Sequence, residues 1–187
     1  KGKMVGEFVG ALPEPRLKMW LEEYLPTEEK EALMAIRERL GNPETTEAAV
    51  EELREFAAKH PDLPLARLIL SSITVFDAPK DAMEDISDIK VGHIFYESAE
   101  NVRTLGELMT FESEEENGAA SKLRTAQEGL TDKDFEKALE AAIEAVEVDK
   151  SHSNDLPRRG AIAIMRFLGP QHPLTARFRR KFEMALY

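Results

Sequence analysis

The chain has 187 residues, of which 42% are apolar, and this is enough for one domain with a hydrophobic core. Its 36 acidic and 25 basic residues give a formal net charge of −11, which argues against nucleic acid and anionic membranes as partners. The sequence contains no cysteine, which excludes disulfides, thiolate chemistry and cysteine-ligated zinc from this chain.

The first 26 residues combine the patterns of one strand and one helix. Residues 4–9 alternate like a half-exposed strand that ends at Gly10, and Leu17, Trp20, Leu21 and Tyr24 follow at helical spacing. A lone strand with one helix cannot bury both apolar faces. We therefore expect residues 1–26 to be the end of a domain whose other elements lie outside this sequence.

Helical patterns cover residues 27–76, with short breaks between them. Thr27 predicts the N-cap of a first helix that Gly41 ends. Asn42 is expected to cap a second helix, with Pro43 at its first position and an end near residue 60. A third helix is expected over about residues 63–76. Its inward stripe consists of Leu65, Leu68, Ile69, Ser72, Ile73 and Phe76.

The rest of the chain continues the helical pattern. Residues 77–89 predict a brief helix and residues 95–109 a longer one, whereas the polar residues 111–118 predict a loop. Two helical segments follow, with a tight turn expected at Gly129 and Leu130 and a capping box formed by Thr131 and Asp134. The last two helices are expected over about residues 156–168 and 173–186.

Helices of this length joined by short loops pack as antiparallel neighbours, so the sequence predicts an all-α fold of stacked helical hairpins. Phe135, followed three residues later by Ala138, is typical of the second helix of a tetratricopeptide repeat, where a small side chain lets a neighbouring helix approach. The first-helix half of the motif is degenerate, and no period of ~34 residues recurs. The repeats are therefore expected to be divergent.

Both ends of the chain resemble the YbbN-type chaperedoxins, in which a thioredoxin-like domain precedes a tetratricopeptide-like helical domain. KGKMVGEFVGAL with LKMWLEEYL is similar to the last strand and helix of a thioredoxin fold, and GPQHPLTARFRRKFEMALY is similar to the C-terminus of that family. The resemblance implies that residues 1–26 are a truncated thioredoxin-like stub and residues 27–187 the tetratricopeptide-like domain. Residues 60–117 match only in helical character.

The resemblance implies that the domain holds unfolding or oxidised client proteins and delivers them to the chaperonin GroEL, with the last helix as a docking element. The protein-binding residues expected there are Arg177, Arg179, Arg180, Met184, Leu186 and Tyr187. The family's cysteine-containing turn lies outside this sequence, so we expect this chain to have no enzymatic activity and no cofactor. It has no signal peptide and no apolar run that could span a bilayer, which favours the cytoplasm and no membrane partner.

Several other residue patterns fit either a functional site or simple packing. An apolar stripe in the last helix favours core packing; it consists of Leu174, Phe178, Phe182 and Ala185. The four histidines lack metal-ligand spacing, and no phosphate loop or nucleophile elbow occurs. Five methionines either line an adaptable client groove or fill gaps between helices. They are Met34, Met83, Met109, Met165 and Met184.

Two other functions remain open from the sequence. The region could position substrates for a thioredoxin-type thiol oxidoreductase, which a Cys-x-x-Cys turn upstream would indicate. It could also be a structural oligomerisation module, which a concentration-dependent mass without any effect on aggregating clients would indicate.

Overall fold

The computed structural model describes residues 27–114 and 118–187, and all regular structure within these ranges is α-helical. The helices in chain order are α2 (Glu28–Leu40), α3 (Thr46–Lys59), α4 (Pro64–Thr74), α5 (Pro79–Asp85), α6 (Tyr96–Met109), α7 (Gly118–Thr131), α8 (Phe135–Asp149), α9 (His152–Leu168) and α10 (Pro173–Ala185). The strand and helix expected within residues 1–26 lie outside the described residues. The predicted all-α fold is confirmed for the part that is described.

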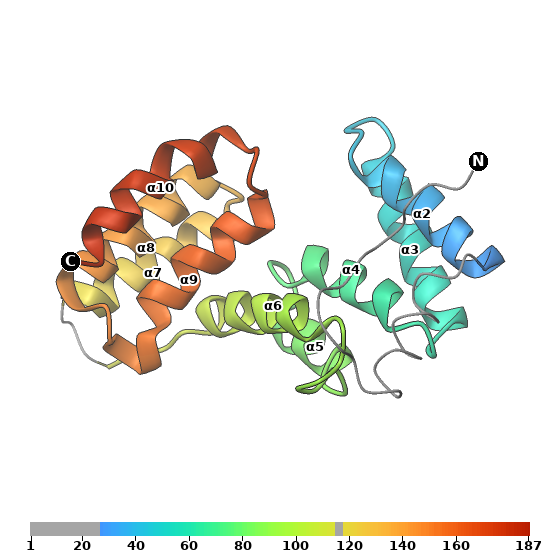
Figure 1. Cartoon of the computed structure of the whole chain (residues 1–187), viewed down its shortest axis with the longest axis horizontal. Coiled ribbons are helices and arrows are strands. Elements are labelled where there is room, and N and C mark those ends of the chain that lie inside the picture. The colour runs from blue at the N-terminus through green and yellow to red at the C-terminus, as the bar shows by residue number, and fades with distance from the viewer. Residues whose placement is uncertain (1–26, 115–117) are drawn as a thin grey trace, which may run out of the picture.

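The helices form hairpins that stack along the long axis of the molecule. Figure 1 shows α2 and α3 at one end, the layered helices α7 to α10 at the other, and α4, α5 and α6 between them. Each helix from α2 to α6 packs against the next one in the chain, and α8 packs against α7, α9 and α10. Contacts between sequence neighbours therefore build most of the fold.

Two hydrophobic cores hold these layers together. The small core lies between α2, α3 and α4, and its buried residues are Leu33, Ile36, Ala49, Leu53, Ala57, Ala66 and Leu70. The large core runs from Leu68 of α4 through α10. Because α4 contributes residues to both cores, it joins the N-terminal hairpin to the rest of the fold.

The N-caps show where local signals decide a helix start. The Thr27 hydroxyl accepts a hydrogen bond from the Lys30 amide, as predicted. The expected start of the second helix at Pro43 is wrong, because α3 begins at Thr46. Asn42 instead closes a turn: its side-chain oxygen accepts from the Glu44 amide, and its carbonyl accepts from the Thr46 amide.

The turn expected at Gly129 and Leu130 is also wrong. Helix α7 continues through both residues to Thr131, whose hydroxyl donates to the Gln127 carbonyl instead of capping the next helix. The chain turns after Thr131, and the Asp134 side chain alone caps α8 by accepting from the Lys137 amide.

Gly129 serves the close packing of α7 on α8. A Cβ atom at this position would lie 2.7 Å from the Ala138 amide nitrogen and 3.0 Å from its Cα. Only glycine on α7 opposite alanine on α8 allows the two backbones to approach this far. The small side chain expected at Ala138 thus has its partner in Gly129, a residue that the sequence pattern assigns to a turn.

Candidate protein-binding groove

A cavity of about 630 Å³ lies between the N-terminal and C-terminal helices. We call it the α4–α6 groove. One wall comes from α4 and consists of Leu65, Leu68, Ile69 and Ser72. The other comes from α6 and the residue before it and consists of Phe95, Glu97, Ser98, Asn101 and Val102. Arg37 of α2 and Arg166 and Phe167 of α9 complete the lining.

The α4 wall exists because this helix is covered on two sides by different cores. Ala66 and Leu70 enter the small core, whereas Leu68 enters the large core. At about 100° per residue, Leu65 and Ile69 fall on the stripe between these two faces. The sequence predicts this stripe to point inward, but Leu65 and Ile69 are only half-buried and line the groove.

Contacts between α6 and α9 fix the far side of the groove. The Asn101 side-chain amide donates to the Ala163 carbonyl at 3.3 Å, and Gly160 allows Leu108 to pack directly on α9. Arg166 lies 3.7 Å from the Glu97 carboxylate, and both side chains are exposed. An exposed pair at this distance stabilises the fold by less than about 1 kcal/mol.

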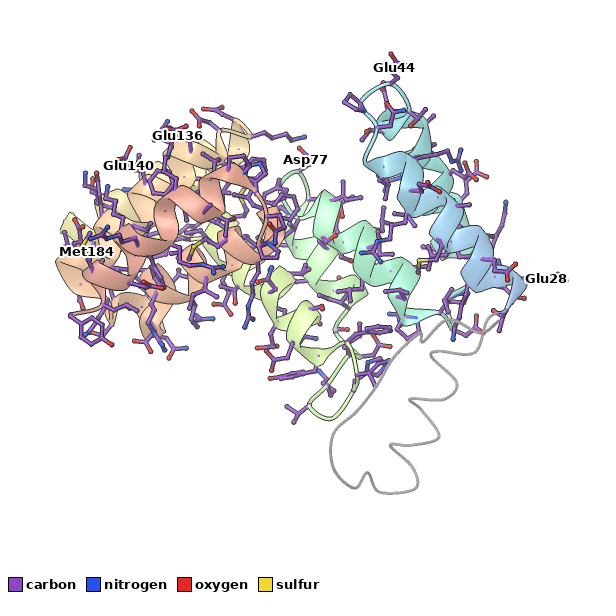
Figure 2. The ribbon with its side chains drawn as sticks, turned by 45° about the horizontal axis from the view of Figure 1, so that its top comes forward. Glu28, Glu44, Asp77, Glu136, Glu140 and Met184 are labelled. Atoms are coloured by element: carbon purple, nitrogen blue, oxygen red, sulfur yellow. The ribbon has the colours of Figure 1, made fainter. Side chains whose placement is uncertain are left out.

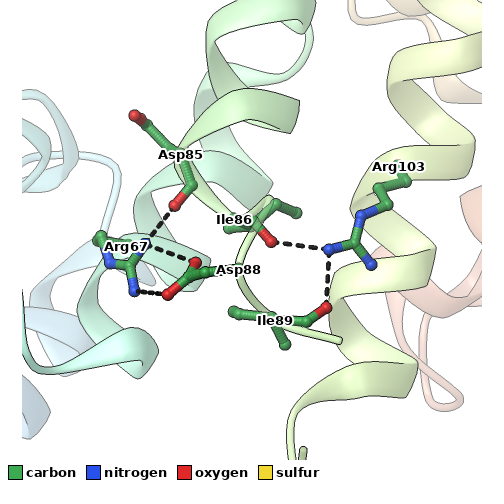
Figure 3. A network of polar contacts seen from close by, with 6 residues as sticks. All are labelled: Arg67, Asp85, Ile86, Asp88, Ile89 and Arg103. Carbon is green, nitrogen blue, oxygen red and sulfur yellow. Dashed lines mark hydrogen bonds and ion pairs between the residues drawn. The ribbon is translucent and has the colours of Figure 1, made fainter. Parts of the chain in front are cut away.

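Two arginines fix the segment that joins the walls (Figure 3). Arg67 of α4 donates from its two terminal guanidinium nitrogens to the Asp88 carboxylate, at 2.9 and 2.8 Å, and from one of them also to the Asp85 carbonyl. Arg103 of α6 reaches the same segment from the other side and donates to the carbonyls of Ile86 and Ile89. We call this network the arginine clamp. It links α4 and α6, the two walls of the groove.

The clamp shifts the pKa values of its two charged partners in opposite directions. The hydrogen bonds from Arg67 lower the pKa of the Asp88 carboxyl below its ordinary value, although partial burial acts in the opposite direction. The same bonds raise the pKa of Arg67. A bidentate arginine–carboxylate pair holds a defined geometry as well as a charge, so the clamp orients the two walls.

An aromatic cluster adjoins the groove through Phe167. Phe76, just after α4, contacts Phe167 of α9 edge-on with ring centroids 4.9 Å apart, and Phe135 of α8 packs against both rings. Phe167 is also part of the groove lining. Three rings from three separate segments therefore anchor the α4 side of the molecule to the C-terminal helices.

A tetratricopeptide repeat family model matches residues 98–187. The matched region begins within α6 and runs through α10. The matched region, just under half of the chain, is similar to tetratricopeptide repeats, and such repeats generally mediate protein–protein interaction. No curated protein and no solved structure matches the chain.

The basic residues of α10 divide into paired and unpaired ones. Arg177 forms an ion pair with Glu136, and Lys181 forms one with Glu140; these two glutamates lie one turn apart on α8 (Figure 2). Arg179 and Arg180 are exposed and form no ion pair with any described residue. Of the arginines expected to bind partners, Arg177 is thus engaged within the fold.

The terminal residues of α10 differ in exposure. Met184 is 64% exposed near the C-terminal end of α10 (Figure 2), and Tyr187 is fully exposed. Leu186 is half-buried against the large core, and its carbonyl accepts from the Lys150 ammonium group. Phe178 and Phe182 are buried, so the core packing expected for the apolar stripe of α10 is confirmed.

Arg179 belongs to a second hollow, of about 400 Å³, between α9 and α10. We call it the α9–α10 hollow. Its apolar lining residues are Ile162, Met165, Pro170 and Phe182. Its polar ones are Thr175, Arg166, Arg179 and Glu183. The sequence analysis predicts neither cavity: the groove combines residues from Arg37 to Phe167, which are distant in the chain, and the hollow depends on how the consecutive helices α9 and α10 pack.

The five methionines singled out in the sequence differ in exposure. Met83, Met109 and Met165 are half-buried, whereas Met34 and Met184 are exposed. Within residues 27–114 and 118–187, no group of side chains has the composition of a metal site. No helix in those two ranges has the length and apolarity that a bilayer crossing requires.

Proposed function

We propose that this chain is a non-catalytic protein-interaction domain that holds unfolded segments of client proteins in the α4–α6 groove. The observation that carries the proposal is the half-buried position of Leu65, Ile69 and Phe95 around a cavity of about 630 Å³. Apolar side chains from a client would bury this surface, at roughly 25 cal/mol per Å². The tetratricopeptide match supports a binding role for the helices on the α6 and α9 side.

The resemblance to the chaperedoxins extends the proposal to oxidised clients, to the cytoplasm, and to delivery of clients to the chaperonin GroEL. Met184 and Tyr187 are the proposed contact residues, because both are exposed at the end of the chain. An exposed methionine suits a surface that must adapt to a partner.

A client-holding assay tests the groove. We expect the chain to suppress light scattering by heat-denatured citrate synthase, and Ser98→Trp to remove most of this effect by filling the groove. Ser98 is exposed and lines the cavity, so the substitution leaves both cores intact. Ser121→Trp on α7 is the matched control, because Ser121 is also exposed and lies outside the groove. Equal activity of both variants would contradict the proposal.

Size-exclusion co-elution with GroEL tests the handover. A chain carrying both Met184→Glu and Tyr187→Glu is expected to lose co-elution, whereas Val148→Glu, at another exposed apolar position, is expected to retain it. Phe182 must stay unchanged because it is buried in the large core. If the wild-type chain does not co-elute, the handover part of the proposal fails while client holding is judged by the scattering assay.

A further inference from the structure

The α4–α6 groove and the α9–α10 hollow share one residue. Arg166 of α9 lines both cavities. Its neighbour Phe167 faces the groove, and Met165 faces the hollow. An extended peptide that runs from one cavity to the other across α9 therefore passes the Arg166 guanidinium.

We propose, resting on the proposed function, that the two cavities form one binding track for an extended apolar segment that carries acidic residues. Arg166 contacts a carboxylate of this segment where the segment crosses α9. The apolar side chains before and after that carboxylate occupy the groove and the hollow. The partner is thus an apolar and acidic stretch of polypeptide.

The charge of the track differs from that of the whole chain. The full sequence has 36 acidic against 25 basic residues. The charged residues that line the track are three arginines and two glutamates: Arg37, Arg166, Arg179, Glu97 and Glu183. The lining of this path thus has a formal net charge of +1, against −11 for the whole sequence, which favours an anionic partner here.

These arginines are available to a ligand. Arg37 and Arg179 form no ion pair among residues 27–114 and 118–187. Among the same residues, Arg166 forms an ion pair with Glu97 alone, at 3.7 Å, with 56% of the arginine side chain and 79% of the glutamate side chain exposed. So weak a pair leaves the guanidinium free to take a second carboxylate.

The acidic cavity on α8 provides the contrast. It is lined by Asp134, Glu136, Glu140 and Glu144, and Lys137 is the basic residue in its lining. Three of these carboxylates are neutralised by partners within the fold, because Arg177, Lys181 and Lys122 pair with them. Most charges on that face are thus paired within the fold, whereas in the described part of the chain Arg37 and Arg179 form no ion pair and Arg166 has the long contact with Glu97.

Isothermal titration calorimetry with three unlabelled peptides tests the inference. The peptides SLDFDLS, SLSFSLS and SLKFKLS share their apolar residues and differ only at two positions, which carry acidic, neutral or basic side chains. We expect the acidic peptide to bind most tightly and the basic one most weakly. Arg166→Gln is expected to weaken the acidic peptide about threefold to fivefold, the effect of one partly exposed charge pair, and to leave the neutral peptide unchanged.

Two further variants sharpen the test. Glu183→Gln removes the carboxylate that would repel the ligand in the hollow and is expected to tighten binding of the acidic peptide. Arg180→Gln is the matched control, because Arg180 is exposed on α10 but lines neither cavity. Unchanged affinity in Glu183→Gln, or weaker binding in Arg180→Gln, would contradict the assignment to the track.

The outcomes separate this inference from the proposed function. If all three peptides bind equally and Ser98→Trp abolishes binding of each, the groove binds clients but the preference for acidic segments is overturned. If Arg166→Gln weakens the neutral peptide as much as the acidic one, Arg166 does not act through charge. If no peptide binds, the track is overturned, and the scattering assay still decides whether the chain holds clients.

Discussion

Gly129→Ala should destabilise the protein, although alanine is the better helix former. The added Cβ would lie 2.7 Å from the Ala138 amide nitrogen, 3.0 Å from its Cα and 3.1 Å from its Cβ. Two of these atoms belong to the backbone of α8, so no side-chain rotation can relieve the overlap. Because contacts between carbon atoms are best at about 3.5–4.0 Å, α7 and α8 must separate by roughly 0.5–1 Å.

The cost of this separation can be worked out from the packing. A gap of that size forfeits about a quarter to a half of the dispersion energy of each contact across the pair. Overpacking of a core typically costs about 1–3 kcal/mol, and the upper end applies where backbone must move. The helix propensity of alanine offsets about 1 kcal/mol. The net expected loss is about 2 kcal/mol, or a fall of roughly 4–8 °C in Tm for a chain of this size.

Two other glycines provide matched controls for the same chemical change. Gly41→Ala is expected to be neutral or to stabilise by up to about 1 kcal/mol, because Gly41 has a φ of −78° and its nearest neighbour would be 3.6 Å away. Gly106→Ala should fall between the two, because the atoms in its way belong to the flexible Met83 side chain. Thermal and urea denaturation followed by circular dichroism measures all three. Equal stability of Gly129→Ala and Gly41→Ala would refute the close approach of α7 and α8.

Three further predictions concern the clamp, the core and the surface. Asp88→Asn should cost about 1 kcal/mol or less, because the carboxylate is 60% exposed. Arg67 lowers the pKa of Asp88 in the folded state, so the stabilisation by the Asp88 carboxylate should be complete above the unfolded pKa of about 3.9 and should vanish as the pH falls through the folded pKa. Urea midpoints of the wild-type protein and of Asp88→Asn across this pH range test the prediction, and a difference between them that persists in acid would contradict it. Leu139→Ala should lower the free energy of unfolding by about 2–5 kcal/mol, because Leu139 is fully buried in the large core, and urea denaturation would show a smaller loss if the site were loosely packed. A double-mutant cycle between Arg177 and Glu136 should give a coupling below about 1 kcal/mol because both side chains are more than half exposed, and a larger value would show that α10 depends on this pair.

Local signals in the sequence predict the helices well but predict poorly which faces they bury. The N-cap at Thr27 and the buried Phe178 and Phe182 follow from capping chemistry and periodicity, and the structure confirms them. Leu65 and Ile69 have the same helical spacing as core residues, yet they line a cavity. Periodicity cannot distinguish them, because α4 lies between two cores and is apolar on several faces.

The wrong start of the second helix has a local cause, the turn at Asn42, whereas contacts between segments account for the other errors. The residues next to Gly129 in the sequence favour a turn there, whereas in the structure Gly129 leaves room for Ala138 of α8 to pack closely on α7. The arginine clamp joins Arg67 to Asp88 across 21 positions, with no local pattern that marks the pair. Arg166 lines two cavities because α9 lies between helices that precede it in the chain, α4 and α6, and the helix that follows it, α10.

Photo-crosslinking of an unfolded client from inside the groove would test whether the α4–α6 groove binds proteins. A photoreactive amino acid replaces Ser98, and the same residue at Ser121 serves as the control, because both positions are exposed and only Ser98 lines the groove. If the groove holds clients, position 98 should yield a crosslinked product with heat-denatured citrate synthase and position 121 should yield little. Equal crosslinking at the two positions, or crosslinking only at position 121, would show that clients bind elsewhere.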